Sequence, residues 1–481
     1  MGSHANTPFG KLFRTPQSYY IYDAPHSEIL EIGQETYDYI DALQRGAAVE
    51  SVPPEVITLL EQGYLKSDSP VRKIEHPYTS IVETLLARKL SLMTLQLTQQ
   101  CNFRCKYCIY SDSHNVRQRS HSDLSMSWDT AKKAVDFLWE HSVDSDSVSI
   151  AFYGGEPLLQ LDLIQEIIAY AGKRFKGKHL QYAMTCNGSL LSKEAVKLLV
   201  ENNVRLMVSM DGPKSIHDKN RVFPDGSGTF DVVIKNLKYI KKAYPKYWKQ
   251  TMISMVVDPQ SDFDEVNKIC HERGIYPRNI MPSILDCEFD DVMVHASADY
   301  IERQEYHRFL SYLAYWGRYP KKHTSPLIER AVMSEKARFA DLSKFAPLSD
   351  SDIPSGPCIP GQMRLFVDVN GKLFPCERVS ETSSVMCIGD IDNGFQIEQV
   401  KKLLNSAAVS AENCKHCWCF RLCSQCVKAA DDGDKLSAAK KLKHCEETRH
   451  DAHARLGSYL LFNEISQRYS SLFGEMDMDG E

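Results

Sequence analysis

The chain has 481 residues, of which 43% are hydrophobic and 25% charged, as in a globular protein of about three domains. This composition excludes a disordered chain, a collagen-like chain and a small disulfide scaffold. The net charge of -6 provides no overall attraction to nucleic acid or to anionic membranes. Since the sequence shows neither a signal peptide nor an apolar stretch of about 18 residues, we expect a cytoplasmic protein that binds no membrane and no nucleic acid.

The first predicted region, residues 1–75, combines strands with helices. Three short β-rich segments come first, at residues 11–14, 19–23 and 28–32. Two helical patterns follow, at residues 34–44 and 54–62. Strands followed by helices in so short a stretch predict a small winged-helix-like domain. The segment 69–81, which contains Pro70 and Pro77, reads as a linker.

Strand and helix patterns alternate over the second region, residues 90–290. The strand-like apolar runs are residues 92–98, 148–153, 180–185, 205–210, 252–257 and 278–281. Amphipathic stretches lie between them, at residues 127–140, 162–175, 192–201, 229–243 and 262–273. Parallel strands need such crossover connections, so we predict an α/β fold built on a parallel sheet. Six units are too few to close an eight-stranded barrel, which favours a partial (β/α)6 TIM-like barrel with its functional residues at the C-terminal strand ends.

The remaining chain divides into three predicted parts. A helical connector covers residues 291–353, and a cysteine-rich domain covers residues 354–450. Within that domain, apolar and polar residues alternate over residues 364–375 on both sides of Asn370-Gly371, which is a strong signal for a β-hairpin. A C-terminal helix and an acidic tail are expected over residues 451–481.

The fifteen cysteines are the most informative residues, because they are clustered in a chain too large to need disulfides. Three form a C-x3-C-x2-C motif directly after a predicted strand: Cys101, Cys105 and Cys108. Three thiolates on one loop suit a cubane iron–sulfur cluster with one open iron. A zinc site would want a fourth ligand, for which only the loosely placed His114 and His121 are near.

Polar and glycine-rich motifs follow three further strands. They are Tyr153-Gly154-Gly155-Glu156-Pro157, Thr185-Cys186-Asn187-Gly188 and Ser209-Met210-Asp211-Gly212-Pro213, the last followed by Arg221. Glycines allow close approach of the backbone to a ligand. A carboxylate such as Glu156 accepts hydrogen bonds from an ammonium group. Such residues at successive strand ends indicate an active site. Cys186 and Cys270 read as core thiols.

This combination of motifs resembles the radical S-adenosylmethionine (SAM) superfamily over about residues 92–281. The resemblance implies that Cys101, Cys105 and Cys108 ligate a [4Fe-4S] cluster whose open iron chelates SAM. It also implies contacts to SAM from Tyr107 (adenine), Gly154, Gly155 and Glu156 (methionyl amine), Asn187 (ribose), and Ser209 and Arg221 (carboxylate). Plain packing for Tyr107 and a turn role for Asn187 are the alternatives.

The second group of cysteines resembles the SPASM extension of radical SAM peptide-modifying enzymes, which carries two auxiliary [4Fe-4S] clusters, so three clusters are expected in all. One departure is the gap of two residues between Cys423 and Cys426, where the family has three. The resemblance implies one cluster on Cys414, Cys417, Cys423 and Cys445. The other would use Cys358, Cys376 and Cys426, with Cys387 or Cys419 as a possible fourth ligand. Zinc sites are the alternative for this region.

An auxiliary cluster with only three cysteine ligands has a chemical consequence. An open iron can bind and deprotonate a substrate thiol. The resemblance therefore implies a thioether synthase of the sactipeptide and ranthipeptide type, in which a 5′-deoxyadenosyl radical activates a peptide carbon that a cysteine sulfur then meets. A formylglycine-forming sulfatase maturase and a carbon–carbon crosslinking maturase are the rival enzymes. A non-catalytic zinc or electron-transfer protein is the rival of another class.

Residues 19–23 and 59–65 resemble the peptide-recognition element of maturases of ribosomally synthesised and modified peptides (RiPPs). That element binds a leader peptide along an exposed strand edge. The expected partners are therefore a leader-bearing, cysteine-containing precursor peptide and an electron donor such as flavodoxin or ferredoxin. Because the first 70 residues hold few Lys and Arg, a winged helix that binds DNA is disfavoured.

Overall fold

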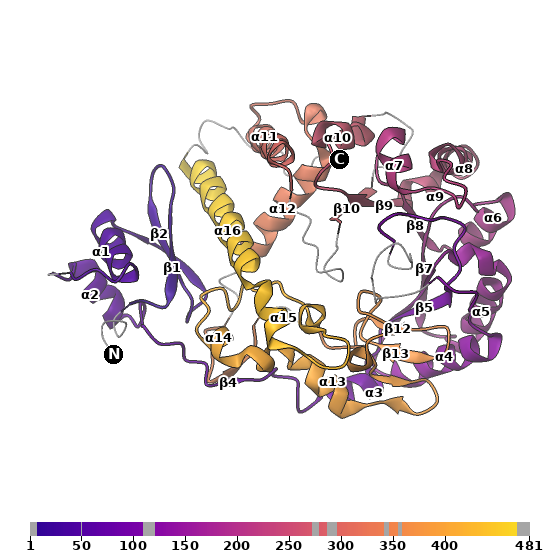
Figure 1. Ribbon diagram of the computed structural model, residues 1–481, viewed down its shortest axis with the longest axis horizontal. Helices are drawn as coiled ribbons and strands as arrows, with labels where there is room; N and C mark the ends of the chain where they lie inside the picture. Colours follow the sequence, from indigo (N-terminus) through magenta and orange to yellow (C-terminus); the bar gives the residue numbers. More distant parts are fainter. Residues whose placement is uncertain are drawn as a thin grey trace.

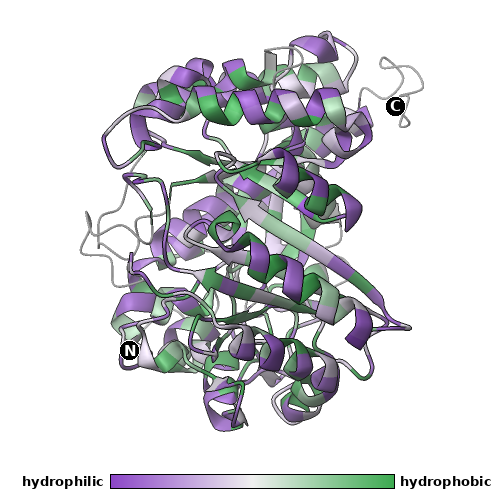
Figure 2. Cartoon of the chain, turned by 90° about the vertical axis from the view of Figure 1, so that its right-hand side faces the viewer, coloured by the Kyte–Doolittle hydropathy of each residue, from purple (hydrophilic) through white to green (hydrophobic). Residues whose placement is uncertain are grey.

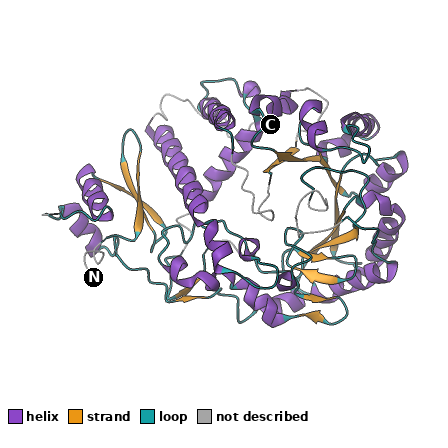
Figure 3. Ribbon diagram, viewed as in Figure 1, coloured by secondary structure: helices purple, strands orange, loops and turns teal. Residues whose placement is uncertain are grey.

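The computed structural model describes residues 7–49, 51–108, 121–271, 279–285, 296–340, 346–354 and 358–468. Several predicted features lie wholly or partly outside these residues, namely His114, the end of the stretch 262–273, the start of the run 278–281 and the acidic tail. The described chain is a mixed α/β structure with a large curved sheet (Figures 1 and 3). Among its helices, none combines the length and the apolar character that crossing a bilayer requires.

The N-terminal region forms a three-stranded antiparallel sheet followed by two helices, at the predicted positions. The strands are β1 (Gly10–Arg14), β2 (Tyr19–Asp23) and β3 (Glu28–Ile32), with β2 in the centre. The helices are α1 (Gln34–Gln44) and α2 (Pro54–Glu61). Alternate residues of the strands pack on the helices in a small core of Leu12, Ile21, Ile32, Ile40, Val56 and Leu65.

The predicted alternation of strands and helices forms a parallel sheet with helices on its outer side (Figures 1 and 3). Its parallel strands follow chain order: β5 (Leu92–Thr98), β6 (Ser147–Gly154), β7 (His179–Cys186), β8 (Arg205–Ser209), β9 (Met252–Val257) and β10 (Asn279–Ile284). The intervening helices are α4 (Trp128–His141), α5 (Leu161–Arg174), α6 (Lys193–Glu201), α7 (Lys214–Asn220), α8 (Phe230–Ala243), α9 (Pro245–Gln250) and α10 (Phe263–His271). The prediction of a partial barrel is confirmed.

Local sequence explains where these helices start and which face they bury. The Ser127 hydroxyl accepts a hydrogen bond from Thr130 N (3.1 Å), and the Ser192 hydroxyl accepts one from Ala195 N (3.1 Å). Helix α4 then turns one apolar stripe toward the sheet: Ala131, Ala134, Val135, Phe137 and Leu138. Figure 2 shows the resulting mixture of hydrophobic and hydrophilic segments along the helices.

The predicted hairpin at residues 364–375 is confirmed, and it extends the barrel sheet. Strand β12 (Leu365–Val367) pairs in parallel with β5, and β13 (Lys372–Phe374) returns antiparallel after a turn at Gly371, whose φ is +86°. Two short strands complete the ten-stranded sheet, β14 (Gly389–Asp390) and β15 (Gly394–Phe395). The cysteine-rich region and the barrel therefore share one sheet across the predicted boundary at residue 354.

The expectation of a plain linker at residues 69–81 is wrong in part. Strand β4 (Lys73–Ile74) pairs in parallel with β11 (Ser351–Asp352). Val71 and Ile74 are buried against Leu348, Ile353, Ala407 and Phe420, because their apolar side chains find a core formed by residues distant in sequence. This segment anchors the N-terminal region to the cysteine-rich region.

The remaining helices join the regions. They are α3 (Val82–Arg88), α11 (Ala298–Tyr315), α12 (Pro326–Ala340), α13 (Ile397–Leu404), α14 (Ala411–Lys415), α15 (Ala438–Lys443) and α16 (Cys445–Arg468). In Figure 1, α16 runs between the N-terminal sheet and α12. Phe13 and Tyr22 of that sheet pack with Leu422, Leu456 and Leu460, so the N-terminal region is docked as well as tethered.

Candidate functional site

The loop of Cys101, Cys105 and Cys108 leaves the carboxyl end of β5 and is held from a distant part of the chain. Arg104 N donates to Val222 O (2.7 Å), and Lys106 N donates to Asn220 O (3.0 Å). Next to the Arg104 bond, the buried Phe103 ring lies edge-on to Phe223, with centroids 5.2 Å apart. The loop conformation is therefore set by the segment that follows α7.

The three thiols of this loop gather in a largely buried space. Burial raises the pKa of Cys101 and of Cys105 to about 12, and the charges of the neighbouring cysteines add to both shifts. At Cys105 the Arg221 guanidinium opposes the rise. Among the described residues, no three Cys, His, Asp or Glu side chains converge on a point that would suit a single metal ion. Three soft thiol ligands spread around a space suit the larger iron–sulfur cube.

The predicted glycine turn packs directly against the start of this loop. Gly155 N donates to Thr98 O and Glu156 N donates to Gln100 O, both at 2.8 Å. A Cβ atom on Gly154 would lie 2.3 Å from Thr98 O, and one on Gly155 would lie 2.0 Å from Gln100 O. The two glycines are therefore required by the approach of two backbone segments, whatever else the turn binds.

Glu156 is completely buried, and its carboxylate accepts two backbone hydrogen bonds. The donors are Leu158 N (3.1 Å) and Asn187 N (2.7 Å), so the side chain joins the ends of β6 and β7. Burial raises its pKa to about 7, against the effect of these two bonds. The predicted contact of Glu156 with an amine stays a prediction, and the structure adds an internal role.

Asn187 belongs to a polar network beside Cys101. Its side-chain amide donates to Asn102 Oδ1 (2.8 Å) and, weakly, to Cys101 Sγ (3.9 Å), while its oxygen accepts from Ser189 N (2.9 Å). Asn102 in turn donates to the Ser189 hydroxyl (2.9 Å). Asn187 is thus a turn residue and also a contact of the cysteine loop.

On the other side of the loop, Arg221 forms a buried ion pair with Asp211. Arg221 Nε lies 3.0 Å from Asp211 Oδ2, and the guanidinium lies 5.4 Å from the centre of the Tyr107 ring. The Tyr107 hydroxyl donates to the same carboxylate. Burial acts to lower the pKa of Arg221, but the opposing effect of its neighbours, chiefly Asp211, is larger and the pKa is raised overall. The guanidinium therefore stays charged. Ser209 is half-buried at the end of β8, and among the described residues its hydroxyl makes no hydrogen bond.

His217 lies next to this ion pair and contacts the backbone of Asp211. It is fully buried, its Nδ1 faces Asp211 N (3.4 Å), and its Nε2 faces the Thr229 hydroxyl (3.0 Å). Burial, with a smaller contribution from Arg221, lowers the pKa of His217 to about 3. The ring is therefore neutral at physiological pH.

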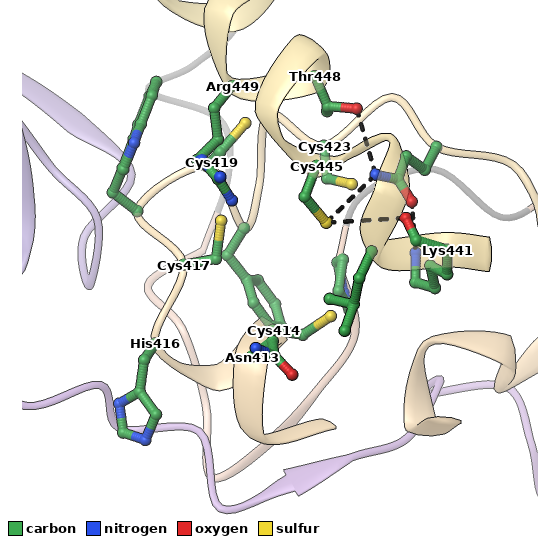
Figure 4. Close-up of a pocket in the computed structure, with 15 residues that line it drawn as sticks. Asn413, Cys414, His416, Cys417, Cys419, Cys423, Lys441, Cys445, Thr448 and Arg449 are labelled. Carbon is green, nitrogen blue, oxygen red and sulfur yellow. Dashed lines mark hydrogen bonds between the residues drawn. The ribbon is translucent and has the colours of Figure 1, made fainter. Parts of the chain in front are cut away.

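The second group of cysteines forms two separate sets. The four predicted ligands Cys414, Cys417, Cys423 and Cys445 line a cavity of about 460 Å³ (Figure 4). Other residues that line it are Cys419, Gln425, Lys441 and Arg449. We call this space the Cys445 cavity. The four predicted ligands surround a volume, as the ligands of a cubane do.

The other set comprises Cys358, Cys376 and Cys426. Burial raises the pKa of Cys376 to about 11, with a contribution from Cys426, and the pKa of Cys426 is raised by burial and by Cys358. These interactions place the three thiols near one another. Of the two candidates for a fourth ligand, Cys419 lines the Cys445 cavity, and the Cys387 thiol donates to Gly389 O (3.5 Å).

A carboxylate from the cysteine-rich region also reaches β5. Glu381 accepts hydrogen bonds from Gln96 Nε2 (2.6 Å) and Gln99 Nε2 (3.1 Å), and Gln96 Oε1 accepts one from Val369 N (3.1 Å). Sequence reasoning missed this contact. The signal was present, because Gln96 lies between Thr94 and Thr98 on one face of a strand whose opposite face is apolar.

Other site residues were also missed. Asp211 stood in a recognised motif, but its pairing with Arg221 could not be read from the sequence. Nothing in the sequence distinguishes the remaining ones from ordinary polar surface residues: Asn102, Ser189, Gln425, Lys441 and Arg449.

Residues 95–273 match the radical SAM superfamily. A cysteine-type anaerobic sulfatase-maturating enzyme of Clostridium perfringens (strain 13) is 24% identical over 368 residues, which are 72% of this chain and 91% of that protein. The radical SAM cyclopropyl synthase TigE of Paramaledivibacter caminithermalis is 23% identical over 247 residues, 47% of this chain and 52% of that protein. For two other curated relatives, the match spans only 49% and 44% of the relative's own length.

A solved structure of native anSMEcpe with bound AdoMet has the same fold. The TM-score is 0.55 at 21% identity, and the alignment covers 80% of this chain and 100% of that one. About a fifth of this chain therefore has no counterpart in that structure.

Proposed function

Because residues 95–273 form a radical SAM domain, we propose that this chain is a radical SAM maturase of a leader-bearing ribosomal peptide. A [4Fe-4S] cluster on Cys101, Cys105 and Cys108 would, with SAM, supply a 5′-deoxyadenosyl radical once a flavodoxin- or ferredoxin-like donor provides an electron. The donor set supports this cofactor, since three soft thiols share one loop beside the charged Arg221.

The residues around the cysteine loop would hold SAM in place. Ser209 offers an uncommitted hydroxyl and Arg221 a permanent positive charge, both suited to a carboxylate. Tyr107, Gly154, Gly155, Glu156 and Asn187 line the remaining sides of the same strand ends. Tyr107 donates to Asp211, Glu156 accepts from Asn187 N, and Asn187 donates to Asn102. Because these side chains already have partners, the pocket would be ordered before SAM binds.

A peptide substrate is supported by the relatives and by the N-terminal sheet. AnSMEcpe has been solved with AdoMet and the Cp18Cys peptide, and the sulfatase-maturating enzymes act on a protein by name. Among the described residues β3 has only β2 as a neighbour, so its outer edge is open to main-chain pairing with a leader peptide. We assign residues 1–75 this recognition role.

The product that the geometry favours is a thioether between a cysteine sulfur and a peptide carbon. The observation that carries this proposal is the set of Cys358, Cys376 and Cys426, while Cys419 lines the Cys445 cavity and the Cys387 thiol donates to Gly389 O. A SPASM-type auxiliary cluster on three cysteines would leave one position for a substrate thiol, which binding would deprotonate. With the Cys445 cavity, the chain would hold three clusters.

The test is an anaerobic reaction of the reconstituted enzyme with cysteine-rich candidate precursor peptides, followed by mass spectrometry. We expect a product that has lost two hydrogens, retains its sulfur and no longer reacts with iodoacetamide at one cysteine. Cys387→Ala should keep the full iron content and this product. Loss of one cluster in Cys387→Ala would contradict the three-cysteine assignment.

Formylglycine formation is a second candidate, because similarity to the Clostridium perfringens sulfatase-maturating enzyme spans 91% of that protein. The same experiment separates the two products. Formylglycine formation removes the cysteine sulfur and leaves an aldehyde that a hydrazide probe captures. A carbon–carbon crosslink would instead leave every cysteine reactive toward iodoacetamide.

A further inference from the structure

Lys441 is a buried cation without a carboxylate partner. It lies on α15 and is 5% exposed, and its ammonium group donates to Gln425 Oε1 (3.0 Å). Among the described residues, no Asp or Glu oxygen lies within ion-pair distance of this ammonium, and none lines the Cys445 cavity. A charge buried without an opposite charge is unfavourable, so a negatively charged occupant of the cavity would remove the imbalance.

Gln425 connects this cation to one of the cysteines. Because a lysine ammonium only donates, Gln425 must turn its oxygen toward Lys441 and its NH2 group the other way. That NH2 group lies 3.5 Å from Cys445 Sγ and 3.2 Å from the Thr448 hydroxyl (Figure 4). Lys441 therefore fixes the orientation in which Gln425 donates to the sulfur of Cys445.

A second cation faces the cavity from α16. Arg449 lines it beside Cys417, where its charge opposes the rise that burial causes in the pKa of that thiol. Figure 4 shows Arg449 and Lys441 on opposite sides of the cysteine group. Two cations and an amide donor thus lie around the four predicted ligand thiols.

We propose that Lys441, Gln425 and Arg449 raise the reduction potential of an iron–sulfur cluster held by Cys414, Cys417, Cys423 and Cys445. The inference rests on the cluster assignment under the proposed function. Reduction adds one negative charge to a cluster that four thiolates already make anionic, so nearby cations stabilise the reduced form more than the oxidised form. Hydrogen bonds to cluster sulfurs act in the same direction. This cluster would accept an electron more readily than one in an uncharged cavity.

The experiment is a redox titration of the full-length, anaerobically reconstituted protein, followed by electron paramagnetic resonance. The signal of this cavity is the one that Cys445→Ser changes. In Lys441→Met we expect unchanged iron content and a reduced-to-oxidised ratio at fixed potential that is about tenfold lower, a shift of about 59 mV for one electron. Arg449→Met should shift it in the same direction, Gln425→Leu by less, and Lys441→Arg little.

Lys440→Met is the matched control, since Lys440 is the preceding residue of the same helix but is partly exposed and faces Asp432 at 3.7 Å. It should leave the potential unchanged. If Lys441→Met loses its cluster, Arg449→Met and Gln425→Leu decide, and unchanged potentials in both overturn the proposal. A Cys445-dependent signal with the same potential in Lys441→Met also overturns it, with the cluster assignment intact. Absence of any Cys445-dependent iron signal in the wild type overturns both.

Discussion

At the scale of single residues, the side chains expected to contact the cofactor already have hydrogen-bond or ion-pair partners within the chain. Glu156 accepts from Asn187 N, Asn187 donates to the cysteine loop, and Arg221 pairs with Asp211. A buried polar group is stable only when it has partners. These residues therefore have a structural role in the pocket wall in addition to any contact with a ligand. Substitutions in them test the structural role and the binding role together.

The fully buried His217 provides a residue-scale prediction about pH. Its pKa is about 3 in the folded chain and near 6.5 when unfolded, so the unfolded state binds the extra proton between these values. Stability is fully present above pH 6.5 and falls as the pH drops toward 3. Between pH 6.5 and 4.5 the wild type should lose up to about 2–3 kcal/mol more unfolding free energy than His217→Gln.

The measurement is chemical unfolding of both proteins across that pH range. His179→Gln, a substitution at the exposed start of β7, is the matched control and should follow the wild type. Identical pH profiles for the wild type and His217→Gln would show that His217 is not held neutral by burial.

At the scale of elements, the site depends on two backbone segments that touch. The turn of Gly154 and Gly155 lies against residues 98–100, which lead from β5 into the cysteine loop. The position of Cys101 is thus determined by the end of β6 as much as by its own strand.

Gly155→Ala should separate this contact. Its Cβ would lie 2.0 Å from Gln100 O, so the loop must move. We expect loss of about a third of the iron, that of one cluster in three, and of SAM cleavage, measured on anaerobically purified protein. Gly172→Ala is the control, because no atom lies within 4 Å of its added Cβ in α5, and it should be neutral or stabilising by about 0.5–1 kcal/mol. Full iron content in Gly155→Ala would show that the loop tolerates the displacement.

At the scale of the whole molecule, the N-terminal region is docked against the Cys445 cavity. Trp418 lines that cavity and lies edge-on to both Phe13 (6.5 Å) and Tyr22 (6.3 Å) of the N-terminal sheet. Arg468 at the end of α16 also donates to Gln17 Oε1 (2.8 Å). The N-terminal region and the cysteine-rich region therefore share an interface.

Removal of residues 1–68 tests this arrangement, since it keeps β4 in place. We expect SAM cleavage to survive, because the cysteine loop and the barrel are retained. Processing of leader-bearing peptide should be lost, and the thermal midpoint should fall, since Trp418 and Leu422 lose their apolar cover. Equal peptide turnover by the truncated and full-length proteins would remove the leader-recognition role.

The sequence by itself determined the barrel and the motifs that lie at its strand ends. Apolar period and length identify β5 to β10, and motifs at their ends identify Cys101, Gly154 and Arg221, because strand ends of a parallel sheet meet at one edge. Local signals were also sufficient for the hairpin at Asn370-Gly371, whose turn depends on adjacent residues only.

Only the tertiary structure decided which distant residues meet. The pairing of β4 with β11, the parallel addition of β12 to β5, and the contact of Glu381 with Gln96 join segments that lie far apart in the sequence. The same holds for the burial of Lys441. Sequence periodicity alone does not distinguish Lys441 from the adjacent Lys440. Hydrogen bonding and burial depend on what packs across from a residue, and that partner is chosen by the folded chain as a whole.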